Sequence, residues 1–120
     1  MKREIKFRGR LFNNKWVYGG ISVFEGETTI FDANCVVNTA YDVDPETVGQ
    51  FMGLKDKNDV EIYEDDILLT DSGIGFVVWN GLSFAIESPG SEAIDYERLD
   101  FYEKCEIIGN LHDNPELIKP

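Results

Sequence analysis

The sequence is short of the residues on which most metal sites and many catalytic sites depend. It contains one histidine, His112, and two cysteines, Cys35 and Cys105, among its 120 residues. A zinc site needs a closely spaced set of cysteines and histidines, and the sequence has no Cys-x-x-Cys pair with which to build one. We therefore expect both cysteines to be reduced thiols of an intracellular protein.

The chain also lacks long apolar runs. The first residues, MKREIKFRGR, have no apolar stretch after their charges, as a secretory signal peptide would have. The longest uninterrupted apolar run, 76–79, is far too short to cross a bilayer. The sequence therefore predicts a soluble cytoplasmic protein without a membrane partner.

Basic residues are scarce, and most of them lie at one end. The net charge is −12, but residues 1–15 hold six basic residues and one acidic residue, a net charge of +5. The other 105 residues carry −17. An acidic body opposes binding to nucleic acid, whereas it can attract the basic segment of another copy. The asymmetry predicts a homo-oligomer, and it leaves open an acidic decoy that occupies a host nucleic-acid-binding protein.

The pattern that is present is that of β strands. Apolar and polar residues alternate in short segments separated by turn residues, such as Asn13–Asn14, Glu25–Gly26 and Gly73–Gly75. Asn80–Gly81 is the strongest hairpin signal, and Gly19–Gly20 predicts a bulge or a close backbone approach. We predict a mainly β fold, a small open barrel or sandwich of short antiparallel strands. The chain is one domain, 1–120, in which an N-terminal β segment, 1–43, can pack on a small barrel, 44–120.

One or two short helical turns are expected within this β fold. Asp44 can cap a turn over 44–47 with proline at the first helical position, and Asn114 and Pro115 repeat that arrangement near the end of the chain. Residues 91–104 follow neither period cleanly, so a short helix is an alternative there.

An acidic stretch, 54–67, is the strongest candidate for a metal or catalytic site. Its acidic residues are Asp56, Asp59, Glu61, Glu64, Asp65 and Asp66. A calcium loop that began at Asp56 would need an oxygen ligand at Val60 and a glycine at Glu61, so the match fails. Asp65 and Asp66 are adjacent and would point to opposite faces of a strand. We assign these carboxylates to turns and to the wet face of a strand, and predict no metal, no cofactor, no catalytic residue and no enzymatic activity.

The N-terminal strand is the candidate interaction surface. Lys6, Arg8 and Arg10 alternate with apolar residues and lie roughly 7 Å apart along one face. Trp16 and Tyr18 on the next strand could lie beside them. These five residues suit contact with an acidic protein surface, and the alternative is stacking and phosphate binding in a nucleic-acid-binding protein.

Four blocks of the sequence resemble the YopX-like proteins of phages and prophages, in the same order and at similar spacing. The blocks read REIKFRGR, VDPETVGQFMGLKDKNDVEIYEDDI, GFVVW and EIIGNLHDNPEL, and together they span almost the whole chain. Asp59 and Asp65 depart from the pattern, because each stands where the family favours glycine in a turn. Aspartate tolerates a positive φ better than most residues, so we expect both turns to persist.

The resemblance implies a mainly β, cytoplasmic accessory protein of a temperate phage or an integrated element, with a tendency to form homo-oligomers. It supplies no catalytic or cofactor-binding residue. Together with the charge pattern, it favours a non-catalytic module that binds itself, or a host or phage protein, over an enzyme.

Overall fold

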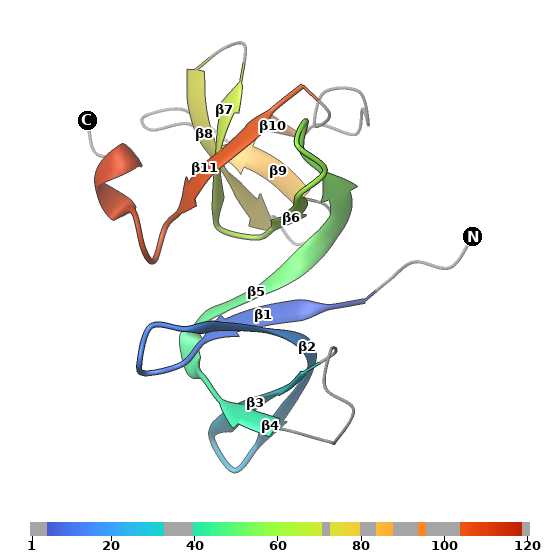
Figure 1. Cartoon of the computed structure of the whole chain (residues 1–120), viewed down its shortest axis with the longest axis vertical. Coiled ribbons are helices and arrows are strands. Elements are labelled where there is room, and N and C mark those ends of the chain that lie inside the picture. Colours follow the sequence, from blue (N-terminus) through green and yellow to red (C-terminus); the bar gives the residue numbers. More distant parts are fainter. Residues whose placement is uncertain are drawn as a thin grey trace. The chain divides into compact units, whose positions relative to one another are not determined.

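Residues 5–32, 40–70, 73–79, 84–87, 94–95 and 104–118 are described by the computed structural model, and strands dominate them (Figure 1). The chain divides into two compact units, Met1–Phe51 and Met52–Pro120, which we call the N-terminal and C-terminal units. This division lies further along the chain than residue 43, the end of the β segment expected from the sequence. The strands form two antiparallel sheets, which confirms the predicted mainly β fold.

The first sheet begins in the N-terminal unit and has the strand order β4-β3-β2-β1-β5-β6. Its strands are β1 (Phe7–Arg10), β2 (Trp16–Phe24), β3 (Glu27–Asp32), β4 (Ala40–Asp42), β5 (Asp44–Lys55) and β6 (Glu61–Tyr63). With 12 residues, β5 is longer than the short strands that the sequence predicts, and it contains the boundary between the two units.

Tight turns join the first three strands where the sequence predicts them. Asn14 adopts a φ of 71° between β1 and β2, and Glu25 and Gly26 adopt 50° and 82° between β2 and β3. Two successive positive φ values suit the twist of an antiparallel hairpin. The bulge expected at Gly19–Gly20 is absent, because both residues pair in register with β3. A Cβ atom on Gly20 would meet nothing within 4 Å, so the close approach predicted as the alternative is absent at Gly20.

Val43 makes the first sheet curl. It is the one residue between β4 and β5, and its N–H donates to the Thr28 carbonyl of β3 (3.0 Å). The next residue, Asp44, already pairs with Arg10 of β1. Within two residues the chain thus passes from β3 to β1, on either side of β2. The fully buried core of the N-terminal unit consists of Val17, Ile30 and Val43.

The segment Asp44–Thr47 is a bulge in β5, not the helical turn predicted from the sequence. Asp44 pairs with Arg10 and Gly49 pairs with Arg8, so residues 45–48 lie opposite Gly9 alone. Asp44 still acts as a local cap: its Oδ1 accepts the Glu46 N–H (3.1 Å), and its carbonyl accepts the Thr47 hydroxyl (2.6 Å). Strand pairing with β1 therefore overrides the local preference for a helical turn.

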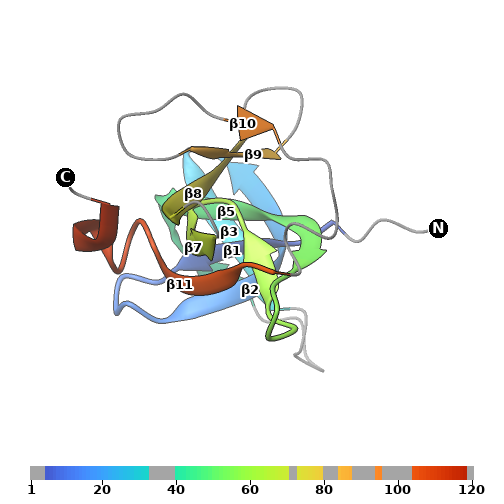
Figure 2. The ribbon, with the colours of Figure 1, turned by 90° about the horizontal axis from the view of Figure 1, so that it is seen from above.

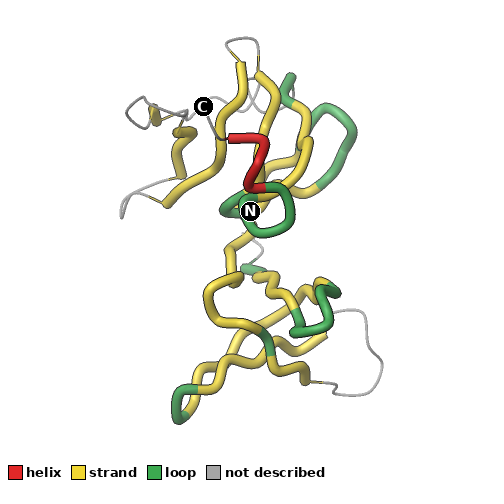
Figure 3. Tube along the Cα trace, turned by 90° about the vertical axis from the view of Figure 1, so that its left-hand side faces the viewer, coloured by secondary structure: helices red, strands yellow, loops and turns green. Residues whose placement is uncertain are grey.

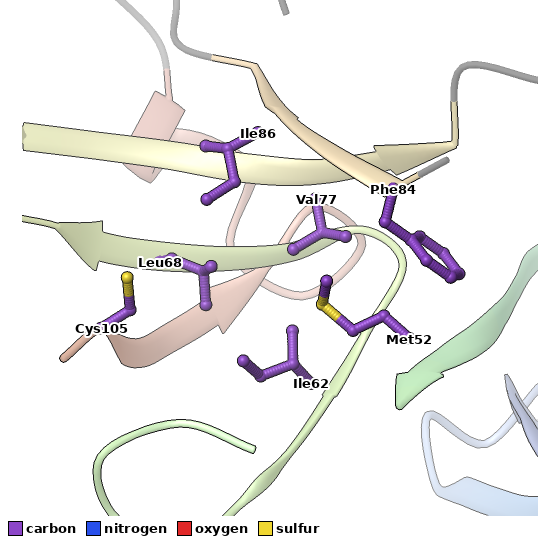
Figure 4. Packing of buried hydrophobic residues seen from close by; sticks show 7 residues of the cluster. All are labelled: Met52, Ile62, Leu68, Val77, Phe84, Ile86 and Cys105. Atoms are coloured by element: carbon purple, nitrogen blue, oxygen red, sulfur yellow. The ribbon is translucent and has the colours of Figure 1, made fainter. Parts of the chain in front are cut away.

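The second sheet lies within the C-terminal unit, in the order β10-β9-β8-β7-β11 (Figure 2). Its strands are β7 (Asp66–Thr70), β8 (Gly73–Trp79), β9 (Phe84–Glu87), β10 (Ile94–Asp95) and β11 (Glu106–Asn110). The core of this unit gathers side chains from several strands (Figure 4). Its buried members are Met52, Ile62, Leu68, Val77, Phe84, Ile86 and Cys105.

The two aspartates that stand where the family favours glycine adopt the positive φ that their turns require. Asp59 has a φ of 63° and Asp65 a φ of 73°, so aspartate holds a left-handed conformation in each turn. Gly73–Gly75, by contrast, begins β8 instead of forming the predicted turn, and residues 71–72 lie outside the described residues.

The chain ends in a 3₁₀ turn, η1 (Pro115–Ile118), drawn as the helix in Figure 3. The Leu117 N–H donates to the Asn114 carbonyl (3.1 Å), which confirms the terminal turn. Asn114 Oδ1 accepts the Asn110 N–H (3.3 Å) instead of an N–H of the turn that follows, so the predicted side-chain cap is not formed. Within 91–104, where a short helix was the alternative, Ile94–Asp95 form β10 and most other residues lie outside the described part, as do Asn80–Gly81 and Cys35. In the described segments, no helix is long and apolar enough to cross a membrane.

Candidate interaction surface

The five residues predicted to form an interaction surface lie on one face of the first sheet. Arg8 is opposite Tyr18 and Arg10 is opposite Trp16 in the β1–β2 ladder. Opposed residues share a face of a sheet, and so do residues two apart on a strand. Lys6 extends the series by two residues before Arg8. The structure thus brings the five residues together, and their role in binding stays a prediction.

The same register carries this face across β3 and β4. Gly20 is opposite Phe31, Phe24 is opposite Glu27, and Thr29 is opposite Asp42. The core residues Val17 and Ile30 occupy the alternate positions, so they lie on the other side of the sheet. We call the side away from this core the outer face. Its members include Lys6, Arg8, Arg10, Trp16, Tyr18, Glu27, Phe31 and Asp42.

Two of the cations on the outer face lie against aromatic rings. The Arg8 guanidinium carbon is 4.8 Å from the centre of the Trp16 ring, and Lys6 Nζ is 5.3 Å from that of Phe51. Both distances suit cation–π attraction. Arg8 is only 6 % exposed, although an alternating polar position predicts an accessible side chain. Because Arg8 is buried against Trp16, it supports the position of that ring and offers little surface of its own to a partner.

Exposed aromatic rings accompany these cations, and sequence reasoning missed one of them. Tyr18 is 38 % exposed and Phe31 is 45 % exposed. Gly20, opposite Phe31, has no side chain to cover that ring. The signal was available, because the alternation along β3 places Phe31 on the opposite side from the buried Ile30. The outer face therefore presents aromatic surface beside positive charge.

A small open pocket of about 220 Å³ lies where the curled sheet brings the β1–β2 turn close to β3 and β4. Its lining residues are Phe12, Gly26, Glu27, Thr28, Asp42, Val43 and Pro45. Thr28 and Val43 are buried, whereas Phe12 is 78 % exposed and both carboxylates are exposed. The pocket thus combines a largely apolar floor with two negative charges and an aromatic ring at its rim.

Several carboxylates of the acidic stretch 54–67 stabilise turns by accepting hydrogen bonds. Asp56 is 5 % exposed and accepts backbone N–H groups of Asn58 (2.8 Å), Val60 (3.0 Å) and Ile107 (3.0 Å). Burial raises the pKa of the Asp56 carboxyl, but these three donors and the nearby Lys57 together hold it below its ordinary value. Asp56 therefore fastens the β5–β6 turn to the start of β11.

The neighbouring turn uses two more of these carboxylates. Asp66, 2 % exposed, accepts the Tyr63 N–H (2.7 Å), which is the turn role predicted for it. Asp65 Oδ2 lies 3.0 Å from His112 Nε2, and the Asp65 carbonyl accepts the Leu111 N–H (2.9 Å). No local sequence pattern indicates this contact, because the two residues lie 47 positions apart. In the described parts of the chain, no three histidine, cysteine, aspartate or glutamate side chains could hold a metal ion together.

Comparison with known proteins adds the family. The family model described as YopX protein matches residues 6–119, which is nearly the whole chain. The chain belongs to the YopX family. The blocks that carry the resemblance lie in β1, in β5 to β7, in β8 and in β11 with η1, so they span both units.

A solved structure has the same fold as this YopX-family chain. The crystal structure of protein EF1440 from Enterococcus faecalis matches with a TM-score of 0.63 at 21 % sequence identity. The match covers 98 % of this chain and 100 % of that one. At this identity the likeness concerns the fold alone. No curated protein matches the sequence.

Proposed function

We propose that this YopX-family protein is a non-catalytic module that associates with a second copy of itself through the outer face of its N-terminal unit. The observation that carries the proposal is the shared register of cations and exposed aromatic rings on that face. Tyrosine, tryptophan and arginine are enriched in the centres of protein interfaces, because they bury much surface and make directional contacts.

Charge supports a second copy as the occupant. The basic segment, 1–15, carries +5, and the remaining residues carry −17, so each copy offers both an attracting and an attracted surface. The outer face itself carries charges of both signs. Arg10 lies on β1, and Glu27 and Asp42 lie on β3 and β4. A surface that carries both signs can be complementary to itself.

The wider setting of the proposal is a cytoplasmic accessory protein encoded by a phage or prophage. It rests on the family and on the composition of the chain. A host or phage protein that presents acidic residues around an apolar centre would suit the same outer face, and it is the second protein partner to test.

Light scattering at two salt concentrations tests self-association. We expect a mass above that of one chain at micromolar concentration and a smaller mass at high salt, because salt screens the attraction between charged surfaces. Tyr18→Ser combined with Phe31→Ser should abolish the assembly. Val60→Ser combined with Leu117→Ser is the matched control, since these exposed apolar side chains lie in the C-terminal unit.

Two outcomes would reject the proposal. A monomer at every concentration tried is one, and equal association of both double variants is the other. Retention of single-stranded DNA or RNA at low salt, lost with Lys6→Glu and Arg10→Glu, would instead favour the nucleic-acid interpretation of the same face.

A further inference from the structure

The pocket beside the β1–β2 turn has the chemistry of a receptor for a cation on an apolar stem. Its lining includes the buried residues Val43 and Thr28 and the exposed acidic residues Glu27 and Asp42. Asp42 Oδ1 also accepts the Thr29 hydroxyl at 3.4 Å. Phe12 adds an exposed ring on which a cation can lie. A volume of about 220 Å³ is below that of typical small-molecule sites, but it accommodates one long side chain.

Lys15 is the side chain that suits this pocket. It is exposed, and its backbone is fixed on both sides: its N–H donates to Asn13 Oδ1 (3.0 Å), and its carbonyl accepts the Leu11 N–H (2.8 Å). Among the described residues no ion pair involves its ammonium group. Lysine combines a four-carbon apolar stem with a terminal charge, which matches an apolar floor below a negative rim.

The location of Lys15 makes a reciprocal contact possible. It belongs to the same turn as Phe12, which lines the pocket, so the cation and its receptor lie in one patch of the N-terminal unit. In a two-fold dimer each copy presents the same patch, and residue i of one copy meets residue j of the other while j meets i. Two identical contacts then form for one act of association.

We propose that the Lys15 ammonium group of one copy binds in the Phe12, Glu27 and Asp42 pocket of a second copy, forming a two-fold symmetric dimer. The inference rests on the proposed self-association and adds the pair of contacts that gives it its geometry. Occupation of the pocket neutralises carboxylates on a strongly acidic chain, and it buries the exposed Phe12 ring.

Charge reversal on either side of the contact provides the test. Lys15→Glu places a carboxylate opposite Glu27 and Asp42, and Glu27→Lys with Asp42→Lys places ammonium groups opposite Lys15. Each variant alone should bind itself about tenfold more weakly or worse, because like charges meet twice in each homodimer. All three positions are exposed, so circular dichroism and thermal unfolding should remain those of the original chain.

A mixture of the two variants makes the test specific. In a heterodimer, the glutamate that replaces Lys15 in the first variant would meet a basic pocket, and the unchanged Lys15 of the second variant would meet an acidic one. Both contacts are then attractive, so an equimolar mixture should regain association close to that of the original chain in sedimentation velocity. Glu87→Lys with Glu116→Lys is the control, because it changes the net charge equally within the C-terminal unit.

The outcomes separate the pocket from the proposed function. If the original chain dimerises and Glu27→Lys with Asp42→Lys associates as tightly as the control, the pocket contact is wrong while self-association stands. Failure of the mixture to recover also overturns the two-fold contact. A monomeric original chain overturns both proposals together.

Discussion

The two units of this protein use their apolar residues differently. The buried apolar cluster described in the N-terminal unit has three members, and this unit leaves Phe12, Tyr18, Phe24 and Phe31 exposed. The corresponding cluster of the C-terminal unit has seven buried members, among them Ile62, Leu68 and Val77, each with no exposed surface. Burial of apolar surface is the main source of stability, whereas exposed aromatic rings are available to a partner. Among the described residues, the larger buried cluster lies in the C-terminal unit and most of the exposed aromatic rings lie in the N-terminal unit, which agrees with the proposal that the N-terminal unit binds the partner.

Their turns differ in the same sense. In the C-terminal unit the buried carboxylates of Asp56 and Asp66 accept backbone N–H groups, so these turns are held by charge-assisted hydrogen bonds. The N-terminal turns at Asn14, Glu25 and Gly26 have positive φ values, as the C-terminal turns do, but among the described residues of that unit no buried carboxylate accepts a backbone N–H group. The sequence contains two tryptophans, Trp16 in the first unit and Trp79 in the second, and each can report on its own unit when the other is changed to phenylalanine.

The largest expected effect is that of Ile30→Ala. Ile30 has no exposed surface and is one of the three buried members of the apolar cluster described in its unit. The cavity should cost about 3–4 kcal/mol, and the few neighbours can collapse into it only partly. Denaturant unfolding followed through Trp16 should shift to a lower midpoint than unfolding followed through Trp79. Leu68→Ala is the matched change and should shift the Trp79 signal instead, while equal shifts of both signals would contradict the comparison.

Loss of the Asp56 carboxylate should be nearly as damaging to the C-terminal unit. Asp56→Ala leaves three backbone N–H groups without their acceptor, at an expected cost of about 3 kcal/mol in the free energy of unfolding. Asp59→Asn, in the same turn, removes the charge of a carboxylate that is 86 % exposed and keeps a side chain that tolerates the positive φ, so it serves as the control. Similar midpoints for the two variants would mean that the turn does not depend on Asp56.

Acid provides a second test of the same carboxylate. The pKa of Asp56 is below its ordinary value of 3.8 in the folded chain, so its contribution is complete above the unfolded pKa and is lost as pH falls through the folded pKa. We expect the Trp79 midpoint of the original chain to fall below about pH 4. In Asp56→Asn the fall of the midpoint that is due to Asp56 should be missing. The same pH profile in that variant as in the original chain would contradict the stabilising role of the Asp56 carboxylate.

Gly9→Ala should destabilise the N-terminal unit by about 1–3 kcal/mol through overpacking. A Cβ atom at Gly9 would lie 2.9 Å from Val43 Cγ2 and 3.1 Å from Ile30 Cδ1, so the core would have to shift. Gly20→Ala is the matched control on the neighbouring strand, because a Cβ atom there meets nothing within 4 Å. The thermal midpoint of Gly20→Ala should stay within error of the original, and equal losses for both variants would exclude close packing as the reason for glycine at position 9.

Local sequence signals predicted most of the strands and turns, since alternation and turn residues act over a few positions. They placed β1 and β2 and the turns at Asn14, at Glu25–Gly26 and at Asp59. They failed at Asp44–Thr47, where a capped proline turn is locally favourable but β5 pairs with β1 across more than thirty positions. No local pattern reveals that pairing.

The sequence predicted which residues form the candidate surface, but it did not predict the burial of Arg8 or the pocket. Alternation brought Lys6, Arg8 and Arg10 to one face, and register places Trp16 and Tyr18 beside them. The burial of Arg8 depends on a ring from the next strand, and the pocket depends on the curl at Val43, which joins residues far apart in the sequence. Features that depend on contacts between residues far apart in the sequence can be identified only from the three-dimensional structure.

The smallest effect is expected at Asp59, and it concerns the turn chemistry of the C-terminal unit. Aspartate at a φ of 63° is held in a conformation that glycine adopts without strain, so Asp59→Gly should stabilise this unit by about 0.5–1 kcal/mol. The ion pair that is lost, Lys55 Nζ to Asp59 Oδ1 at 3.6 Å, is exposed and contributes little. Asp65→Gly relieves a similar φ of 73° but also removes the contact with His112, so it should bring no gain. If both variants raise the Trp79 midpoint equally, the His112 contact adds nothing to the stability of the C-terminal unit, and backbone conformation alone determines the residue that each turn prefers.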